Sequence, residues 1–458
     1  MKFLGIVYKE ETKEGDLDKM KLLTFKGGVH PDDGKNLSKD KKIIKVLPQK
    51  ELVFPLSQHI GAPAEPIVKV GERVLRGQKI AEAKGFVSSP LYSSVSGKVK
   101  KIEPRVNPAG MKTMSIVIEN DGEYEEAFEV IDRDPEKLSK EEILSIISDA
   151  GVVGMGGAGF PTRVKLSPKE PEKIDHIIVN CAECEPYITA DYRRMLENPE
   201  ELIGGLKVVL ELFENAKGVL AVEDNKKDCY ALLESMTRNE PRIEVKLLKT
   251  KYPQGAERQL IYAVTGRAIH SKNLPADAGC IVDNVETIIS IYNAVAKGIP
   301  SIERVITVSG DGVKEPGNFK VLFGMDQREI IEAAGGMKEN VEKVISGGPM
   351  MGFSMYTLDI PVTKTSSSLL CFTKDEVSEY EPSPCINCGR CVNVCPSRII
   401  PSRLADLAER HDEEAFVKLN GLECVECGCC SYVCPAKRHL KQAIGYMRKT
   451  ALANMKKK

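Results

Sequence analysis

Apolar and polar residues alternate in short runs up to about residue 130, and glycines and prolines separate the runs. In the stretch VKVGERVLRGQKIAEAKGF, this alternation includes Val68, Val70, Val74 and Ile80. A period of two residues places apolar side chains on one face of a strand, and the intervening glycines favour turns. Residues 1–130 are therefore predicted to form a small domain of short β-strands.

The pattern changes at residue 131, and helical runs alternate with strand-like runs up to residue 297. Ser139 has Glu142 at the capping-box spacing and precedes isoleucines on one helical face. Further helices are expected at 202–213 and 228–236, and strands at 174–179, 218–222 and 242–248. This alternation predicts a parallel, doubly wound sheet with helices on both faces, a Rossmann-like domain over 131–297.

A shorter unit is expected at 298–362. Strand-like ERVITVSG and EKVISGG flank a Gly/Pro turn and the helical run DQREIIEAAGG. Such an order predicts a small α+β domain of the β-grasp type. The serine-rich run TKTSSSLLC (363–371) is expected to be a linker that opens a last segment, 363–458, whose helices lie around 404–419 and 437–454.

Composition narrows the class of protein. The chain of 458 residues has 65 Lys and Arg against 66 Asp and Glu, a formal charge of −1, so it lacks the basic excess on which general nucleic-acid binding depends. Its length predicts about three or four domains. No run approaches the roughly 18 apolar residues of a membrane-spanning helix, and the acidic start MKFLGIVYKEETKEGD is not typical of a signal peptide. A cytosolic protein is expected.

Nine of the 14 cysteines fall between Cys385 and Cys434, where CINCGRCVNVCP and CVECGCCSYVCP repeat one motif, C-x2-C-x2-C-x3-C-P. In a cytosolic chain such clustering indicates metal or redox chemistry. The spacing is that of two-cluster ferredoxins, in which the fourth cysteine of each motif binds the other cluster. Two [4Fe-4S] clusters are expected, one bound by Cys385, Cys388, Cys391 and Cys434 and the other by Cys424, Cys427, Cys430 and Cys395.

Other interpretations of these cysteines are weaker. Structural zinc sites more commonly use pairs of C-x2-C than two runs of four that end in Cys-Pro. Cys429 is an additional cysteine in the second motif, and its simplest interpretation is a spare thiol that points away from the cluster. No residue nearby offers obvious acid–base or nucleophilic chemistry, so this segment is expected to relay electrons.

A glycine-rich run, GVVGMGGAGFPTRVKL, contains Gly154, Gly156 and Gly159 in the G-x-G-x-x-G register. It follows a helical pattern and runs into Pro161, whereas the usual dinucleotide fingerprint follows a strand and opens a helix. A flexible turn therefore remains an alternative. As a binding loop, its backbone N–H groups would approach a phosphate or a flat ring, with Lys165 nearby as a point charge.

Polar residues also gather where strands are expected to end, the position at which an open α/β sheet forms its binding crevice. Each is also typical of turns and helix caps. Cys181 and Cys184 form a C-x2-C pair, for which a redox or metal role is conceivable and small buried side chains are the simpler interpretation. The polar set, from NCAECEPY, YPQGAERQ and DNVET, comprises Asn180, Glu183, Glu185, Tyr187, Gly255, Glu257, Asn284 and Thr287.

These motifs together carry a family resemblance. GMGGAGFPT, NCAECEPY, YPQGAERQ and DNVET, followed by a β-grasp unit and two ferredoxin-type motifs, resemble the RnfC family of the Rnf ion-translocating electron-transport complexes. TFKGGVHP (24–31) and LSQHIGAPAEPIVKVG (56–71) extend the resemblance over nearly the whole chain. The first domain also resembles the barrel-sandwich fold of lipoyl and biotinyl carrier domains, but GFVSSPLYS stands where those display a modifiable lysine, so a docking or structural role is expected.

The α/β part is also similar to the flavin-bearing, NADH-oxidising subunit of respiratory complex I, and this similarity implies cofactor roles. Two departures weaken the carry-over: only Glu257 of an expected glutamate pair is present, after Ala256, and Leu166 replaces an aromatic residue. Non-covalent FMN would lie against Gly154, Gly156, Gly159, Asn180, Glu183, Gly255 and Asn284, and NAD(H) against Gly157, Phe160, Lys165, Glu185 and Glu257, with Tyr252 also counted as cofactor-binding.

The resemblance implies a peripheral subunit on the cytoplasmic side of the cell membrane that exchanges hydride between NAD(H) and FMN and relays electrons through two [4Fe-4S] clusters. Its partners would be other Rnf-type subunits, membrane subunits among them, and indirectly ferredoxin, with Na⁺ or H⁺ transport performed elsewhere. The tail from Lys437 carries eight Lys/Arg and no acid, which suits an anionic membrane, an acidic partner or simply a solvated helix. A soluble reductase such as cobalamin reductase, or a non-catalytic electron-transfer adaptor, would share many of these features.

Overall fold

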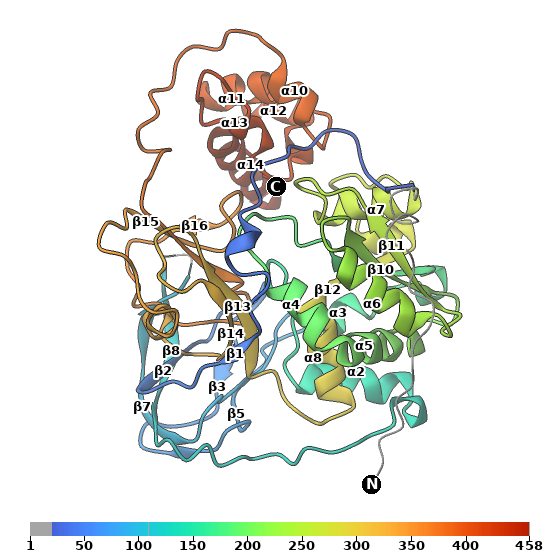
Figure 1. The fold of residues 1–458 in the computed structure, drawn as a ribbon, viewed down its shortest axis with the longest axis vertical. Helices are drawn as coiled ribbons and strands as arrows, with labels where there is room; N and C mark the ends of the chain where they lie inside the picture. Colours follow the sequence, from blue (N-terminus) through green and yellow to red (C-terminus); the bar gives the residue numbers. More distant parts are fainter. Residues whose placement is uncertain (1–20, 109, 458) are drawn as a thin grey trace.

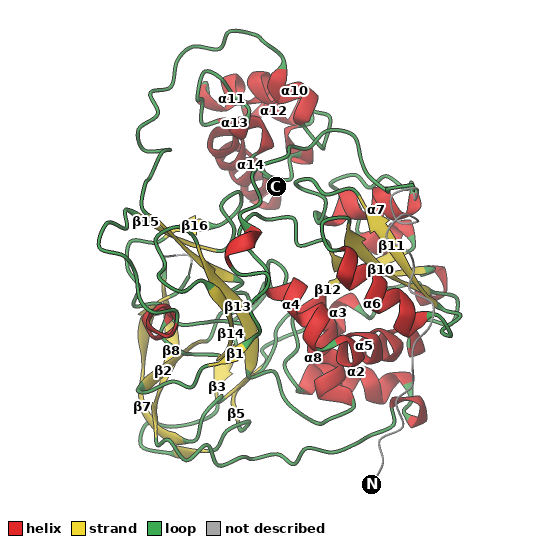
Figure 2. Cartoon of the chain, in the orientation of Figure 1, coloured by secondary structure: helices red, strands yellow, loops and turns green. Residues whose placement is uncertain are grey.

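The computed structural model describes residues 21–108 and 110–457, and its strands form four sheets (Figures 1 and 2). The β-rich parts lie on one side, the α/β unit on the other, and the cysteine-bearing helices at one end. Within the described residues, no helix combines the length and the apolar character needed to cross a bilayer.

The β module contains two small antiparallel sheets. One has the order β2 (Glu51–Pro55), β8 (Lys112–Asn120), β7 (Gly97–Val106), β4 (Arg73–Val74), and the other β3 (Glu65–Pro66), β5 (Lys79–Glu82), β6 (Leu91–Tyr92). Val68, Val74 and Ile80 are buried as expected, but Val70 is 62% exposed because it lies in the turn that ends at Gly71. The module shares one apolar core with the β-grasp unit.

Residues 21–45, which the prediction includes in the domain 1–130, pair with strands and loops of the other units; residues 1–20 lie outside the described chain. Leu23 bridges Leu248 at the edge of the α/β sheet, and Val29 bridges Tyr252. The chain then passes the base of the cysteine-bearing helices, forms the short helix η1 (Lys35–Leu37) and adds β1 (Ile44–Lys45) to the β-grasp sheet (Figure 1). This first segment therefore connects three units.

The α/β unit is built on a parallel sheet of order β11-β10-β9-β12. Ile177 and Val179 face a core with α5 and α8, whereas Ile178 faces a smaller core with α7, so helices cover both faces as predicted. Ser139 caps α2 in a capping box with Glu142. The elements are α2 (Lys140–Asp149), α3 (Thr162–Lys165), β9 (His176–Cys181), α4 (Ala190–Glu197), α5 (Pro199–Glu211), β10 (Lys217–Glu223), α6 (Lys227–Thr237), β11 (Ile243–Leu248), α7 (Glu257–Thr265), β12 (Cys280–Asn284) and α8 (Val285–Val295), with short 3-10 turns η2 (Pro135–Lys137), η3 (Pro171–Lys173) and η4 (Pro275–Ala278).

The β-grasp unit has a six-stranded mixed sheet, β1-β14-β13-β17-β15-β16. Its strand β17 (Ser368–Phe372) lies between β13 and β15, and Thr363, Lys364 and Ser366 are buried. The expectation of a linker at 363–371 is therefore wrong, because apolar Leu369 and Leu370 complete the core beyond residue 362. The other elements are β13 (Glu303–Ser309), β14 (Gly317–Leu322), α9 (Gln327–Ala333), β15 (Lys343–Ser346) and β16 (Phe353–Ser354).

The cysteine-bearing segment is helical and has a core of its own around Leu404, Phe416 and Ile444. Its last helix, for which a solvated tail was one interpretation of the sequence, buries Leu440, Ile444, Met447 and Ala451. The elements are α10 (Arg390–Val394), α11 (Pro401–Glu409), α12 (Glu413–Lys418), η5 (Gly421–Glu423), α13 (Cys429–Tyr432) and α14 (Leu440–Lys457).

Candidate functional site: an α/β crevice and two cysteine cavities

The order of the parallel strands defines where the α/β unit can bind a ligand. The chain leaves β9 toward β10 and β11 on one side, and β12 returns on the other side. Where connections leave on opposite sides, an open α/β sheet forms its crevice outside the carboxyl ends of the two strands concerned, here β9 and β12. Asn180 at the end of β9 and Asn284 at the end of β12 are paired in register, so both amides lie at this crevice.

The glycine-rich loop lies along the crevice. Its base is closed by a hydrogen bond from Gly154 N–H to the Phe160 carbonyl (2.9 Å), and Met155 N–H donates to Thr287 Oγ1 (2.9 Å). At its tip, Gly156 and Gly157 are exposed, and a Cβ added at Gly156 would lie 2.7 Å from Asn284 Cβ. A rigid base with an exposed glycine tip lets a phosphate or flat ring approach the backbone.

Other domains hold the base of this loop. Lys364 is buried, and its Nζ donates to the carbonyl oxygens of Gly151 (2.6 Å) and Pro90 (2.8 Å) and to Ser89 Oγ (3.2 Å). Burial lowers the pKa of Lys364 to about 7. Lys364 was not predicted as a site residue because its serine-rich surroundings indicated a linker; the lysine connects the β module, the loop and the β-grasp unit.

Asn180 anchors the loop that precedes α7. Its Nδ2 donates to the Gly255 carbonyl (2.8 Å), and a Cβ at Gly255 would lie 3.1 Å from Asn180 Oδ1. Gly255 N–H donates to Cys184 Sγ (3.3 Å). Asn180 and Gly255 thus meet at the end of β9.

Asn284 brings in an acid that was not among the predicted site residues. Its Nδ2 donates to Asp191 Oδ2 (2.6 Å) at the start of α4. Burial, together with the charges of Glu183 and Glu286, raises the pKa of Asp191 to about 7. The signal was present in the sequence, since Asp191 follows NCAECEPYITA within the same motif.

Lys165 and Glu257 mark the other end of the crevice. Lys165 Nζ donates to the Val282 carbonyl (2.8 Å) and pairs with Asp283 Oδ1 (3.2 Å). Burial disfavours its ammonium, but Asp283 and Glu257 raise the pKa of Lys165 overall, so it stays charged. Glu257 is the exposed first residue of α7. Asp283, which was not predicted, is 2% exposed and fixes the lysine.

Three predicted cofactor residues have other contacts. Glu183 accepts the N–H groups of Asp191 (2.7 Å) and Tyr192 (3.3 Å) and faces Lys35, so it caps α4 beneath the crevice. Glu185 Oε2 accepts the N–H of Met350 (3.1 Å) in the β-grasp unit, and burial raises its pKa to about 7. Tyr252 is 1% exposed and lies at the junction with the cysteine-bearing segment. All three side chains therefore hold other parts of the protein in place around the crevice.

The eight predicted cluster cysteines line two separate cavities, in the crossed sets that the motif spacing predicts. One cavity is bordered by Cys385, Cys388, Cys391 and Cys434. The other is bordered by Cys395, Cys424, Cys427 and Cys430, and Cys429 also borders it. Each set of four thiols fits the donor set of one [4Fe-4S] cluster, which takes four cysteine thiolates.

The two loops that carry these cysteines repeat the same backbone geometry. Asn387 and Glu426, each two residues after the first cysteine, have φ of 54° and 55°. Their N–H groups donate to Cys385 Sγ and Cys424 Sγ, both at 3.4 Å. Hydrogen bonds to ligand sulfurs tune the reduction potential of an iron–sulfur cluster. Both loops therefore place an N–H donor where it would stabilise a cysteine thiolate ligand.

Of the remaining cysteines near the site, Cys181 and Cys429 are buried and Cys184 is partly buried. Cys429 donates from Sγ to the Tyr252 carbonyl (3.8 Å) in a contact with the α/β unit. Cys181 lies in the large core of the α/β unit, whereas Cys184 lies at the junction near Tyr252. Burial raises the pKa of both, that of Cys184 to about 12, which favours small buried side chains over a redox pair.

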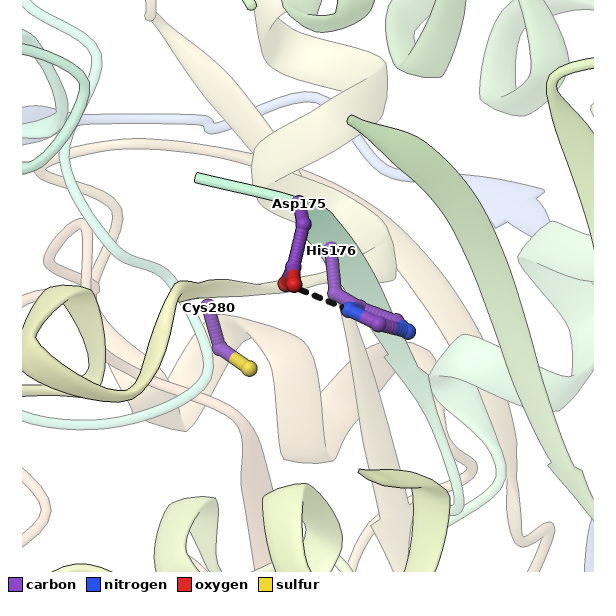
Figure 3. A group of neighbouring side chains, drawn as sticks. All are labelled: Asp175, His176 and Cys280. Carbon is purple, nitrogen blue, oxygen red and sulfur yellow. Dashed lines mark hydrogen bonds and ion pairs between the residues drawn. The ribbon is translucent and has the colours of Figure 1, made fainter. Parts of the chain in front are cut away.

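A further group with metal-ligand chemistry, Asp175, His176 and Cys280, lies at the opposite end of the sheet, where β9 and β12 begin (Figure 3). Both oxygens of Asp175 are already bound by the Arg267 guanidinium, at 2.7 and 2.6 Å, and Oδ1 also contacts His176 Nδ1 (2.6 Å). These contacts stabilise the ends of β9 and β12 that lie opposite the crevice.

Comparisons with known proteins agree with this arrangement. Family models match the RnfC barrel-sandwich hybrid domain at 23–123, the Nuo51 FMN-binding domain at 147–293, the SLBB domain at 305–354 and the 4Fe-4S dicluster domain at 384–437. The C subunit of the proton-translocating ferredoxin:NAD(+) oxidoreductase complex of Clostridium ljungdahlii is 46% identical over 93% of this chain and 94% of its own length. The chain belongs to the RnfC family.

Other RnfC proteins match at a similar level. The C subunit of the Na(+)-translocating complex of Acetobacterium woodii is 42% identical over 95% of this chain and 98% of its own length. Among solved structures, an NAD⁺-reducing [NiFe]-hydrogenase in the H2-reduced state matches with a TM-score of 0.48 and 19% identity over 70% of this chain and 62% of that chain. The family matches confirm the predicted order of a barrel-sandwich, an FMN-binding, an SLBB and a dicluster domain.

Proposed function

We propose that this RnfC protein binds FMN and NAD(H) in the α/β crevice, exchanges hydride between them, and relays single electrons through two [4Fe-4S] clusters. Its main support is that a crevice at the switch point of an FMN-type domain is joined, through Tyr252 and Cys427, to one of the two cysteine-lined cavities. The flavin supplies the exchange between two-electron and one-electron chemistry, and the chain supplies position and charge.

The crevice residues have distinct proposed roles. The exposed tip of the glycine loop and the amides of Asn180 and Asn284 bind the flavin, with Asp191 orienting Asn284 through the 2.6 Å hydrogen bond. Lys165, held by Asp283, offers a fixed positive charge to the nucleotide, and exposed Glu257 borders the same end. Glu183, Glu185 and Tyr252 support the loops from beneath.

The partners follow from the family. The relatives are named as parts of ferredoxin:NAD(+) oxidoreductase complexes, one proton-translocating and one Na(+)-translocating. This chain is therefore one member of an assembly of several subunits, and we propose that ferredoxin reaches it only through the others. Ion transport is assigned to membrane subunits, to which this chain binds on the cytoplasmic face. The near full-length match favours this role over that of a soluble cobalamin-type reductase.

Purification of the full chain under anaerobic conditions tests the proposal. About one FMN and about eight irons per chain are expected, the content of two [4Fe-4S] clusters. NADH should then reduce ferricyanide through the bound flavin. An Asn284→Ala variant should retain its iron and lose flavin, whereas His439→Ala, a change at an exposed residue of the cysteine-bearing segment, should retain both. A wild-type chain with full iron that neither binds added FMN nor oxidises NADH would leave only an electron-transfer adaptor.

A further inference from the structure

The two cysteine cavities differ in how they contact the rest of the molecule. Tyr252 Oη donates to the Cys427 carbonyl (2.8 Å), and Cys429 Sγ donates back to the Tyr252 carbonyl (3.8 Å). Tyr252 belongs to the same loop as Gly255, which contacts Asn180 at the crevice. These two hydrogen bonds therefore join the crevice loop to Cys427 and Cys429, which both border the second cavity.

Neighbouring contacts involve the same cavity. Glu423, which precedes Cys424, pairs with Arg258 of α7 (Glu423 Oε2 to Arg258 Nη1, 3.1 Å). The carboxylate of Glu423 also accepts the N–H of Ser271 (2.8 Å) and its hydroxyl (2.6 Å). The segment that enters the second motif is therefore fixed on the α/β unit by charge and hydrogen bonds.

Cys395, the ligand that crosses over from the first motif, is fixed from the same side. Gly28 N–H donates to the Val394 carbonyl (2.8 Å), and a Cβ at Gly27 would lie only 2.9 Å from that oxygen and 3.0 Å from the Cys395 carbonyl. Gly27 has φ of 94°, so no other residue fits this close approach without strain. The N-terminal segment thus packs between Tyr252 and Cys395.

The space between these contacts is apolar. Val29, Tyr252, Cys427 and Cys429 form one buried cluster, and its partly buried neighbours are Cys184, Met350, Val394, Val425 and Val433. The α/β unit, the β-grasp unit, the cysteine-bearing segment and the N-terminal segment all contribute to it. This apolar packing keeps the α/β unit and the second cavity at a fixed separation.

The other cavity faces outward. Cys388 is exposed, and Ile386 beside it is 66% exposed. Within the described chain, no hydrogen bond or ion pair joins residues 385–391 to the α/β unit. The two cysteine loops therefore share one backbone geometry and differ in their position relative to the α/β unit.

We propose that the two clusters are arranged in series. The inner cluster exchanges electrons directly with the flavin in the crevice and is held by Cys395, Cys424, Cys427 and Cys430. The outer cluster faces a one-electron carrier protein and is held by Cys385, Cys388, Cys391 and Cys434. Tyr252 is the positioning residue that fixes the inner cluster. This inference rests on the proposed function. Each NADH oxidised to NAD⁺ releases one proton to solvent and two electrons, which pass singly to the inner cluster, the outer cluster and the carrier, and no covalent bond of the chain changes.

Loss of either cluster tests this order in the full, flavin-loaded chain. Cys388→Ala removes a ligand of the outer cluster and Cys427→Ala one of the inner cluster, so about four irons should remain in each variant. In rapid anaerobic mixing with NADH, the cluster that remains in Cys388→Ala should be reduced at the wild-type rate. The cluster that remains in Cys427→Ala should be reduced at least tenfold more slowly by NADH, yet normally by dithionite.

The opposite pattern, or equal rates in both variants, would overturn the order. A wild-type chain whose clusters NADH does not reduce would instead overturn the proposed function.

Tyr252→Phe tests the inference without loss of a ligand, since it removes only the donor to the Cys427 carbonyl. One of the two cluster midpoint potentials should shift, and the same one should be absent in Cys427→Ala. Tyr432→Phe, at a 52% exposed residue of the same motif, should shift neither. An unchanged potential in Tyr252→Phe, or a shift in the outer cluster, contradicts the positioning role.

Discussion

At the scale of single residues, carboxyl groups lie close together beside the crevice. Asp191 shares its surroundings with Glu183 and Glu286, and its pKa lies at about 7 rather than near 4. The folded state therefore holds a proton that the unfolded chain has already lost above pH 4. Stability from this group is full at low pH and falls as the pH rises from about 4 to 7.

Asp191→Asn should remove this penalty, because an amide cannot ionise and its oxygen still accepts from Asn284. In flavin-free protein, the melting temperature of the variant minus that of the wild type should grow from pH 5.5 to about 7.5 and then level off. The gain at pH 8 should be about 1–2 kcal/mol, less than the full shift implies, since Asp191 borders an open crevice. A difference that is constant across this range would show that Asp191 does not titrate there.

Lys165 can be tested separately as a binding residue and as half of an ion pair. Lys165→Gln should raise the KM for NADH about tenfold or more and also destabilise the fold, because Asp283 is left buried without its partner. Lys165→Gln combined with Asp283→Asn should regain the stability but not the affinity. If the double variant binds NADH normally, the lysine contributes only to folding.

At the scale of elements, the glycine loop combines an anchored base with a free tip. Gly159 has φ of 70°, and a Cβ there would lie 2.9 Å from Thr365 Cγ2 and 3.0 Å from the Gln58 carbonyl. Gly157 has nothing within 4 Å of an added Cβ. The two glycines of one motif therefore serve different purposes.

Gly159→Ala should lower the stability of the flavin-free protein by about 1–3 kcal/mol, the cost of backbone strain and close contact. Gly157→Ala should leave that stability unchanged and weaken FMN binding instead. Thermal melts with and without FMN distinguish the two effects. Equal destabilisation by both substitutions would contradict the division of the loop into base and tip.

The sequence predicted elements better than their connections. The strands of the α/β sheet, the capping box at Ser139 and the crossed cysteine sets are local patterns, and all were recognisable without the fold. The serines of residues 363–371 predict a linker, but the segment leads into a buried strand, β17. Its partners, β13 and β15, come earlier in the chain, so local composition does not reveal the pairing. Glu183 and Tyr252 belong to the family motifs, but Glu183 caps α4 and Tyr252 contacts the cysteine-bearing segment. A position in a motif does not by itself show where a side chain points.

At the scale of the whole molecule, the clusters should be required for part of the fold only. The cysteine-bearing segment has a small core in which Cys391 and Cys395 themselves take part, whereas the α/β unit has a large core of its own. Iron removal by a chelator under anaerobic, reducing conditions should therefore increase amide exchange in α10–α14 and leave β9, β10 and α5 protected. Loss of protection in both units at once would show that the junction at Tyr252 couples them into one folding unit.

In the proposed function, electrons travel between NAD(H) and the cysteine clusters through a flavin in the crevice. Rapid anaerobic mixing of the FMN-loaded, iron-replete chain with NADH, with flavin and cluster absorbance followed together, tests it most directly. We expect flavin bleaching to come first and cluster bleaching to follow, and protein stripped of FMN should show neither until FMN is restored. Clusters that NADH reduces equally fast without FMN, or that stay oxidised while the bound flavin is fully reduced, would contradict it.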